Sequence, residues 1–327
     1  MARVFVGIPT RNRARYVKEA LESVRHQTFS DLRIVVSDNH SEQTCIDEVG
    51  AFIDGLHDPR VSYVVQPENR GQSGQILFLF GACREEYFAL LDDDDQHAPH
   101  FLGIGLQTLD ANQDLAFFSC NQCLIDERGT PLPEFTETYN ADLGRMRLRE
   151  GVVEDYLATT LARGVFSIMG TIFRTRVLRE CGLFDHPKVY HVDFNIFVRL
   201  AERGKKGYWC AQALSIYRWH PEQTRRRVNW EFHEDMMMSY LGLIEARRYD
   251  GRAERVRQFL LSFACRRLAY IMLVRGVYGA AYGYMFRAIR ADWRNWRMWL
   301  KIGFAMVFPM LVPLFWKNKV TLTVTPN

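Results

Sequence analysis

Four consecutive aspartates, Asp92, Asp93, Asp94 and Asp95, directly follow a short apolar run at residues 87–91. Carboxylates this close together repel one another and raise each other's pKa unless a cation neutralises them. Hard divalent cations such as Mg²⁺ and Mn²⁺ take oxygen ligands, and Mg²⁺ often completes its shell with substrate phosphates. This acidic run (residues 92–95) therefore predicts a metal site for a phosphorylated ligand. A solvated acidic loop is the alternative.

The segments around the acidic run alternate between strand and helix patterns. Short apolar runs predict four buried strands, at residues 4–8, 33–36, 61–65 and 87–91. Residues 14–26 place apolar side chains on one helical face, and residues 73–83 form a second predicted helix. Such alternation indicates βαβ units and a mostly parallel sheet. Because ligands bind beyond the carboxyl ends of such strands, we expect the polar clusters there to form one site. These clusters are at residues 9–13, 38–39 and 92–95.

The second half of the chain is less regular. Strands are predicted at residues 115–119 and 208–218, and a helix at residues 194–203. The polar stretch that contains Pro131 and Pro133 predicts a loop. From about residue 232 to residue 316 the pattern is helical. We therefore expect an α/β domain over residues 1–231 and a helical region over residues 232–327.

The composition indicates a folded, reduced protein. The chain has 327 residues, of which 48% are hydrophobic and 24% charged, and this excludes a disordered chain. Seven cysteines are too few for a disulfide scaffold, and the lone Cys120-x-x-Cys123 motif is interpreted as structural. The opening residues show no secretory signal, so a cytoplasmic location is expected.

Charge is distributed unevenly along the chain. Residues 247–319 contain 15 Lys and Arg but only 3 Asp and Glu, whereas residues 1–246 are acidic overall. Trp293, Trp296 and Trp299 alternate with cations just before an uncharged run, residues 302–316, which is too short to span a membrane comfortably. This pattern favours binding of the C-terminal segment to the membrane surface. A packed helical layer or an oligomer interface is the alternative, and the apolar run argues against nucleic acid.

Five segments of the chain, in order, resemble the family 2 inverting glycosyltransferases. They are residues 4–44, 68–71, 87–102, 181–204 and 215–220. The resemblance covers about residues 3–225. Each motif alone is weakly specific, but the five in order carry weight together. The resemblance implies the family's fold, called GT-A, which is a nucleotide-sugar-binding α/β domain with a mostly parallel mixed sheet.

The resemblance implies a donor site built from strand ends. The first loop, at residues 9–13, would line the base and ribose, and Asp38 would accept hydrogen bonds from them, unless it only caps the next turn. Asp92 would face the ribose, while Asp94 and Asp95 would hold the metal. The expected donor-binding residues are Pro9, Thr10, Asn12, Arg13, Asp38, Asn39, Arg70, Asp92 and Asp93.

The resemblance also implies a catalytic base and groups for the leaving diphosphate. Asp193 matches the family's acid before a helix and would take the acceptor's proton, its alternative role being a helix cap. His220 would complete the metal shell or contact the diphosphate, unless it is a surface histidine. Arg225, Arg226 and Arg227 suit a diphosphate, with a solvated basic loop as the alternative.

These expectations describe an inverting glycosyltransferase that depends on Mn²⁺ or Mg²⁺. It would move a sugar from a nucleoside-diphosphate donor to a saccharide, expected to be lipid-linked, at the inner face of the membrane. Cell-surface polysaccharide or glycoconjugate synthesis is the expected setting, and a homo-oligomer is left open. The alternatives are a polyprenyl-phosphate sugar synthase and a non-catalytic membrane-bound module. A processive synthase is not expected, because residues 223–227 lack the Trp of the Gln-x-x-Arg-Trp motif.

Overall fold

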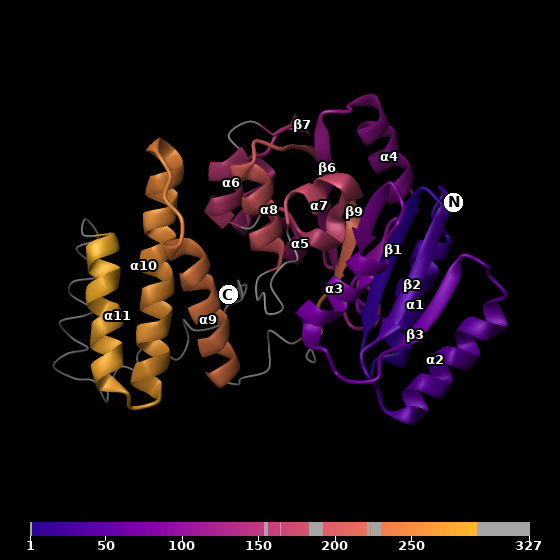
Figure 1. Cartoon of the computed structure of the whole chain (residues 1–327), viewed down its shortest axis with the longest axis horizontal. Helices are drawn as coiled ribbons and strands as arrows, with labels where there is room; N and C mark the ends of the chain where they lie inside the picture. Colours follow the sequence, from indigo (N-terminus) through magenta and orange to yellow (C-terminus); the bar gives the residue numbers. More distant parts are fainter. Residues whose placement is uncertain are drawn as a thin grey trace. The chain divides into compact units, whose positions relative to one another are not determined.

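Figure 1 shows the computed structural model of the chain. It describes residues 2–153, 156–163, 165–182, 192–220, 223 and 230–292. The chain divides into two compact units. The first contains Met1–Tyr156 and Arg163–His220, and the second contains Leu157–Ala162 and Pro221–Asn327.

The first unit is built on a nine-stranded sheet in the order β3–β2–β1–β4–β8–β6–β9–β5, with β7 paired to β9. The strands are β1 Val4–Thr10, β2 Leu32–Asp38, β3 Val61–Val65, β4 Tyr87–Leu90, β5 Gln96–His97, β6 Leu115–Ile125, β7 Gly151–Val152, β8 Thr171–Arg174 and β9 Lys206–Arg218. Parallel pairs join β1 to β2 and β4, β2 to β3, and β6 to β9. β8 is antiparallel to both of its neighbours, β4 and β6. The predicted mostly parallel mixed sheet is confirmed.

Helices cover both faces of this sheet (Figure 1). In β1, Val4, Val6 and Ile8 belong to one hydrophobic cluster and Phe5 to the other, because alternate side chains of a strand point to opposite faces. The first cluster is covered by α1 Ala14–Arg25, α2 Gln43–Leu56 and α4 Phe101–Ala111. The second is covered by α3 Gly71–Ala82, α7 Thr175–Glu180 and α8 Val192–Glu202.

One prediction for this unit was wrong. The stretch expected to be a loop contains α5, Pro133–Asp142, in which Pro133 lies in the first turn. Proline is tolerated there because the N–H group it lacks has no partner within the helix. The middle segment also contains the 3₁₀ turns η1 Arg145–Arg147 and η2 Ile168–Gly170. Its helix α6, Tyr156–Arg163, belongs mostly to the second unit. Cys120 is buried, Cys123 is half-buried and both are free, which fits a structural role.

The second unit contains three long helices. These are α9 Trp230–Glu245, α10 Gly251–Val274 and α11 Tyr278–Ala291. They share an apolar cluster that includes Met237, Leu268 and Met285, and they confirm the predicted helical pattern as far as residue 291. Within the described part of the chain, no helix has both the length and the apolar character needed to cross a membrane. The tryptophan-rich segment from residue 293 onward lies outside the described residues.

Candidate active site

The acidic run begins where β4 ends, at the carboxyl edge of the sheet. Leu91 still donates its backbone N–H to Gly7 of β1 at 3.0 Å, and the chain then turns, with Asp95 N–H donating to Asp92 O at 3.1 Å. This turn brings Asp92, Asp94 and Asp95 together. One carboxylate oxygen from each lies within 4.8 Å of the other two. Three of the four aspartates therefore converge.

Asp93, the fourth aspartate, points towards the first loop instead. Its two oxygens accept hydrogen bonds from Thr10 Oγ1 at 2.8 Å and from Arg13 Nη1 at 2.9 Å. The same Arg13 nitrogen lies 2.7 Å from Asp94 Oδ2. Burial, reinforced by the charge of Asp94, raises the pKa of Asp93 to about 6. Two of the predicted donor-site residues, Thr10 and Arg13, thus bind the acidic run directly.

His220 lies against the acidic run from the far end of β9. Its Nε2 is 3.0 Å from Asp94 Oδ2, and its ring packs on Tyr16 of α1 at 4.9 Å between centroids. The side chain is 0% exposed, so the surface-histidine alternative is wrong. Burial alone would raise the pKa of Asp94, but the hydrogen bond from His220 and the charge of Arg13 hold it below its usual value.

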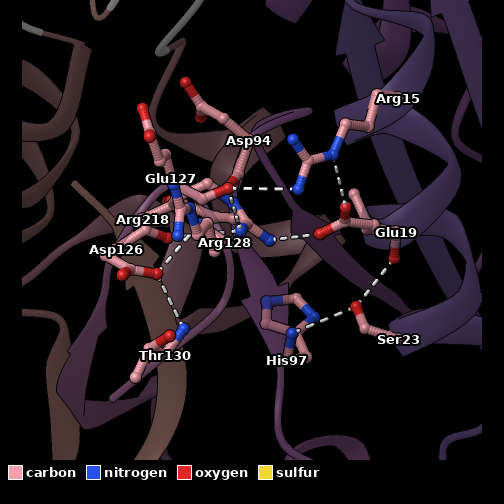
Figure 2. Close-up of polar contacts among 12 residues, drawn as sticks. Arg15, Glu19, Ser23, Asp94, His97, Asp126, Glu127, Arg128, Thr130 and Arg218 are labelled. Carbon is pink, nitrogen blue, oxygen red and sulfur yellow. Dashed lines mark hydrogen bonds and ion pairs between the residues drawn. The ribbon is translucent and has the colours of Figure 1, made fainter. Parts of the chain in front are cut away.

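Arg218, at the end of β9, fastens the acidic run to the rest of the domain (Figure 2). Its backbone N–H donates to Asp95 Oδ1 and its Nε to Asp94 O, both at 2.9 Å. Nη2 donates to Glu19 of α1 at 2.6 Å, and Nη1 lies 3.3 Å from the carbonyl oxygens of Asp126 and Glu127. The side chain is only 1% exposed. Arg218 stands two positions before His220, and its role was not predicted from the sequence.

His97 and Met169 hold the start of the acidic run in place, and their roles were not predicted from the sequence either. The Met169 sulfur accepts the backbone N–H of Asp92 at 3.1 Å, and the Met169 carbonyl oxygen lies 2.7 Å from His97 Nε2. Burial lowers the pKa of His97 to about 4, so the ring is neutral at physiological pH and donates its proton to that carbonyl. The 3₁₀ turn that contains Met169 is thereby held beside Asp92.

The predicted residues of the first loop and of β2 form a continuous polar edge. Asn12 has a positive φ of 54° and accepts the N–H of Glu42 at 2.7 Å. Asp38 is fully buried, and its oxygens accept hydrogen bonds from Ser41 N–H at 2.7 Å and Tyr63 OH at 2.9 Å. Asp38 therefore holds the turn after β2, as the capping alternative predicts, and its contact with the donor stays a prediction.

Asn39 connects this edge to the start of α3. Its Oδ1 accepts the Arg70 backbone N–H at 2.7 Å and Gln75 Nε2 at 2.9 Å, and its own backbone N–H donates to Thr10 O at 2.8 Å. Pro9 pairs in register with Ser37 of β2. The predicted donor-binding residues are therefore contiguous along one edge of the sheet.

The remaining predicted residues are less fully described. Asp193 is the second residue of α8, in the first turn of the helix. Nothing is described of its side chain. Arg225, Arg226 and Arg227 lie outside the described residues.

Known proteins share this architecture. The chain is 26% identical over 248 residues to the GalNAc(5)-diNAcBac-PP-undecaprenol beta-1,3-glucosyltransferase of Campylobacter jejuni, covering 75% of this chain and 73% of the relative. Several other relatives are matched over less than two thirds of their own length.

Two solved structures match in fold at 15% identity. The mannosyltransferase PcManGT of Pyrobaculum calidifontis, in complex with GDP-Man and Mn²⁺, has a TM-score of 0.59, with 89% of this chain and 75% of that one covered. The S. aureus TarS 1-349 structure with UDP-GlcNAc has a TM-score of 0.62, with 89% and 81% covered.

The family model for Glycosyl transferase family 2 matches residues 5–169, which is just over half of the chain. The matched region includes the first loop, the acidic run and Met169, so it contains most of the site described above. The chain is a glycosyltransferase and belongs to glycosyl transferase family 2.

Proposed function

We propose that this protein transfers one sugar from a nucleoside-diphosphate donor to a saccharide acceptor, with inversion at the anomeric carbon and with a divalent cation. The convergence of Asp92, Asp94 and Asp95 within 4.8 Å, beside the first loop, is the observation that carries the proposal. An acidic group placed where the parallel strands end is suited to a cation and a diphosphate together.

The residues present fit a Mg²⁺ or Mn²⁺ ion. The donor set is three carboxylates, which are hard oxygen ligands, and His220 stands 3.0 Å from the middle one. Asp94 and Asp95 would hold the ion, with Asp92 and His220 within reach. The bound ion would neutralise the charge that develops on the departing diphosphate. Arg13 already balances part of the acidic charge, and Arg218 fixes the position of Asp94 and Asp95.

Asp193 is the proposed general base. The acceptor hydroxyl loses its proton to the Asp193 carboxylate as it attacks the donor carbon, and a base so placed contributes on the order of 10²- to 10⁴-fold in rate. Arg225, Arg226 and Arg227 are the proposed contacts of the leaving diphosphate.

The proposed acceptor is a lipid-linked saccharide at the cytoplasmic surface of a membrane. Two facts support this. The name of the Campylobacter relative specifies an undecaprenol-diphosphate-linked acceptor, and the C-terminal residues 247–319 are strongly basic. Basic segments are attracted to anionic lipid by roughly 1 kcal/mol for each Lys or Arg near the surface.

Release of nucleoside diphosphate from a panel of nucleotide sugars tests the proposal. We expect release with Mn²⁺ or Mg²⁺, none in EDTA, and a large loss in Asp94→Ala. Saccharide acceptors should accelerate release more than polyprenyl phosphate does, and the reverse order would favour the polyprenyl-phosphate synthase. An absence of turnover with every donor would favour a non-catalytic module.

A further inference from the structure

Four aromatic side chains form a row beside the proposed metal site. Trp219 packs edge-to-face on Phe135 at 4.8 Å between ring centroids, Phe135 on Tyr139 at 6.5 Å, and Tyr139 stacks on Tyr217 at 5.8 Å. Phe135 and Tyr139 come from α5, Tyr217 comes from the end of β9, and Trp219 follows that strand directly. All four are half-buried, so part of each ring reaches the surface. We call these four residues the aromatic row.

The aromatic row lies next to His220, which contacts the acidic run. Trp219 immediately precedes His220, whose Nε2 is 3.0 Å from Asp94. Arg218 and His220 contact Glu19 and Tyr16 of α1, whereas Tyr217 and Trp219 pack on α5. Because neighbouring side chains of a strand point to opposite faces, Tyr217 lies on the face away from Arg218 and α1, and the other three rings pack with it there.

That face is the one on which α8 packs. The ring of Phe197 in α8 is 5.2 Å from that of Phe117 in β6, within the hydrophobic cluster opposite α1. Asp193, the proposed base, is in the first turn of α8. An acceptor that delivers its hydroxyl to Asp193 approaches from this side of the sheet.

Hydrogen bonds between α5 and β6 fix the position of the aromatic row. Leu124 of β6 donates its backbone N–H to Thr136 Oγ1 of α5 at 2.9 Å, and Asn140 Nδ2 donates to Gln122 O at 2.8 Å. Arg145 packs over the Tyr139 ring at 5.8 Å and donates to Asn140 Oδ1 at 3.1 Å. With Tyr139 covered by Arg145 and Tyr217, Phe135 and Trp219 are the rings best placed to meet a ligand.

We propose that Phe135 and Trp219 form the subsite for a pyranose ring of the saccharide acceptor, a step that rests on the proposed function. A pyranose has one apolar face of C–H groups, which packs on the negatively polarised face of an aromatic ring. Ligand sites commonly combine aromatic surfaces with a few polar groups that fix orientation. The rings hold the acceptor sugar, and the carboxylate of α8 takes the proton from its hydroxyl.

Substitutions that keep apolar volume but remove the flat ring separate ligand stacking from packing. The probes are the methyl β-glycosides of glucose, galactose, N-acetylglucosamine and N-acetylgalactosamine, observed by saturation-transfer NMR with protein holding the diamagnetic ion Mg²⁺ and UDP or GDP. We expect at least one glycoside to bind through its C–H face, about tenfold more weakly in Phe135→Leu and Trp219→Leu. Phe135→Tyr, which keeps a flat ring, should bind the glycoside as the wild type does. Glu137→Ala, a change at an exposed position of α5, should also bind it with wild-type affinity.

Two results would overturn the subsite. One is an absence of saturation transfer to all four glycosides, and the other is equal binding by wild type and Phe135→Leu. Nucleotide affinity, measured by calorimetry on the same samples, separates the two proposals. A wild-type protein that binds neither UDP nor GDP with Mg²⁺ contradicts the proposed function. Normal nucleotide binding with unaltered glycoside binding in the leucine variants contradicts the subsite alone.

Discussion

Replacement of Arg218 by methionine should destabilise the first unit and loosen the acidic run. The side chain is 1% exposed and donates to Asp94 O at 2.9 Å, to Glu19 at 2.6 Å, and to two loop carbonyl oxygens at 3.3 Å. Methionine fills much of the volume but removes all of these hydrogen bonds. Glu19 and Glu127 O keep Arg15 as a donor, whereas Asp94 O loses the donation from Arg218. Hydrogen bonds from a charged group contribute about 1.5–3 kcal/mol each.

The expected loss is smaller than the sum of these bonds. Glu19 is 35% exposed, so water partly replaces its partner, and the two bonds at 3.3 Å are long. We therefore expect a loss of about 3 kcal/mol in the free energy of unfolding. Urea denaturation followed by circular dichroism measures it. The affinity for Mn²⁺ should fall as well, because Arg218 positions both Asp94 and Asp95.

Arg15 supplies the matched control. It also donates to Glu19 and to Glu127 O, but its side chain is 63% exposed. An exposed ion pair contributes about 0.2–1 kcal/mol, so Arg15→Ala should be nearly as stable as wild type. If Arg218→Met loses less than about 1 kcal/mol, or no more than Arg15→Ala does, the assignment of Arg218 as the anchor of the acidic run is refuted.

Three further perturbations test other parts of the account. Asp193→Asn should lower kcat at least about 10²-fold with donor affinity retained, and a kcat near wild type in steady-state assays would exclude the base. In EDTA, the lowered pKa of His97, about 4 in the folded protein, makes stability depend on pH. Its contribution to the free energy of unfolding is complete above pH 6.5, and about 3 kcal/mol is lost as the pH falls towards 4. Urea unfolding at pH 7 and pH 4.5 should therefore show a smaller loss of stability for His97→Gln than for the wild type. An equal loss in the two proteins would contradict this. The full chain should sediment with anionic vesicles at low salt, and much less of it should do so after replacement of Trp293, Trp296 and Trp299 by alanine. If the wild type does not sediment with the vesicles, binding to the membrane surface is excluded.

Local sequence patterns were sufficient to predict the main strands and the acidic run. A buried strand next to charged residues is visible within a dozen positions, as at residues 87–95, and parallel topology then places its end with the ends of β1 and β2. The antiparallel strand β8 between β4 and β6 has no such local signal, since its place depends on pairing with strands that precede it by more than 40 residues.

The supporting side chains could not be predicted for the same reason. Arg218 is 124 residues from Asp94 and 199 from Glu19 in the sequence, so its role depends on the complete fold. The hydrogen bond from Tyr63 on the neighbouring strand to Asp38 also depends on the complete fold. Helix α5 was missed because its polar composition resembles that of a loop, although Pro133 is suited to a first turn.

Calorimetric titration of nucleotide sugars into the wild-type protein, with Mn²⁺ and then with EDTA, tests the central proposal most directly. The donor panel should include UDP- and GDP-sugars. We expect one donor to bind with Mn²⁺ and its binding to be lost in EDTA, in Asp94→Ala and in Asp95→Ala, while the variants keep their circular dichroism spectra. Equal donor affinity in Mn²⁺ and in EDTA, or in the two variants and the wild type, would contradict a metal-dependent donor site at the acidic run.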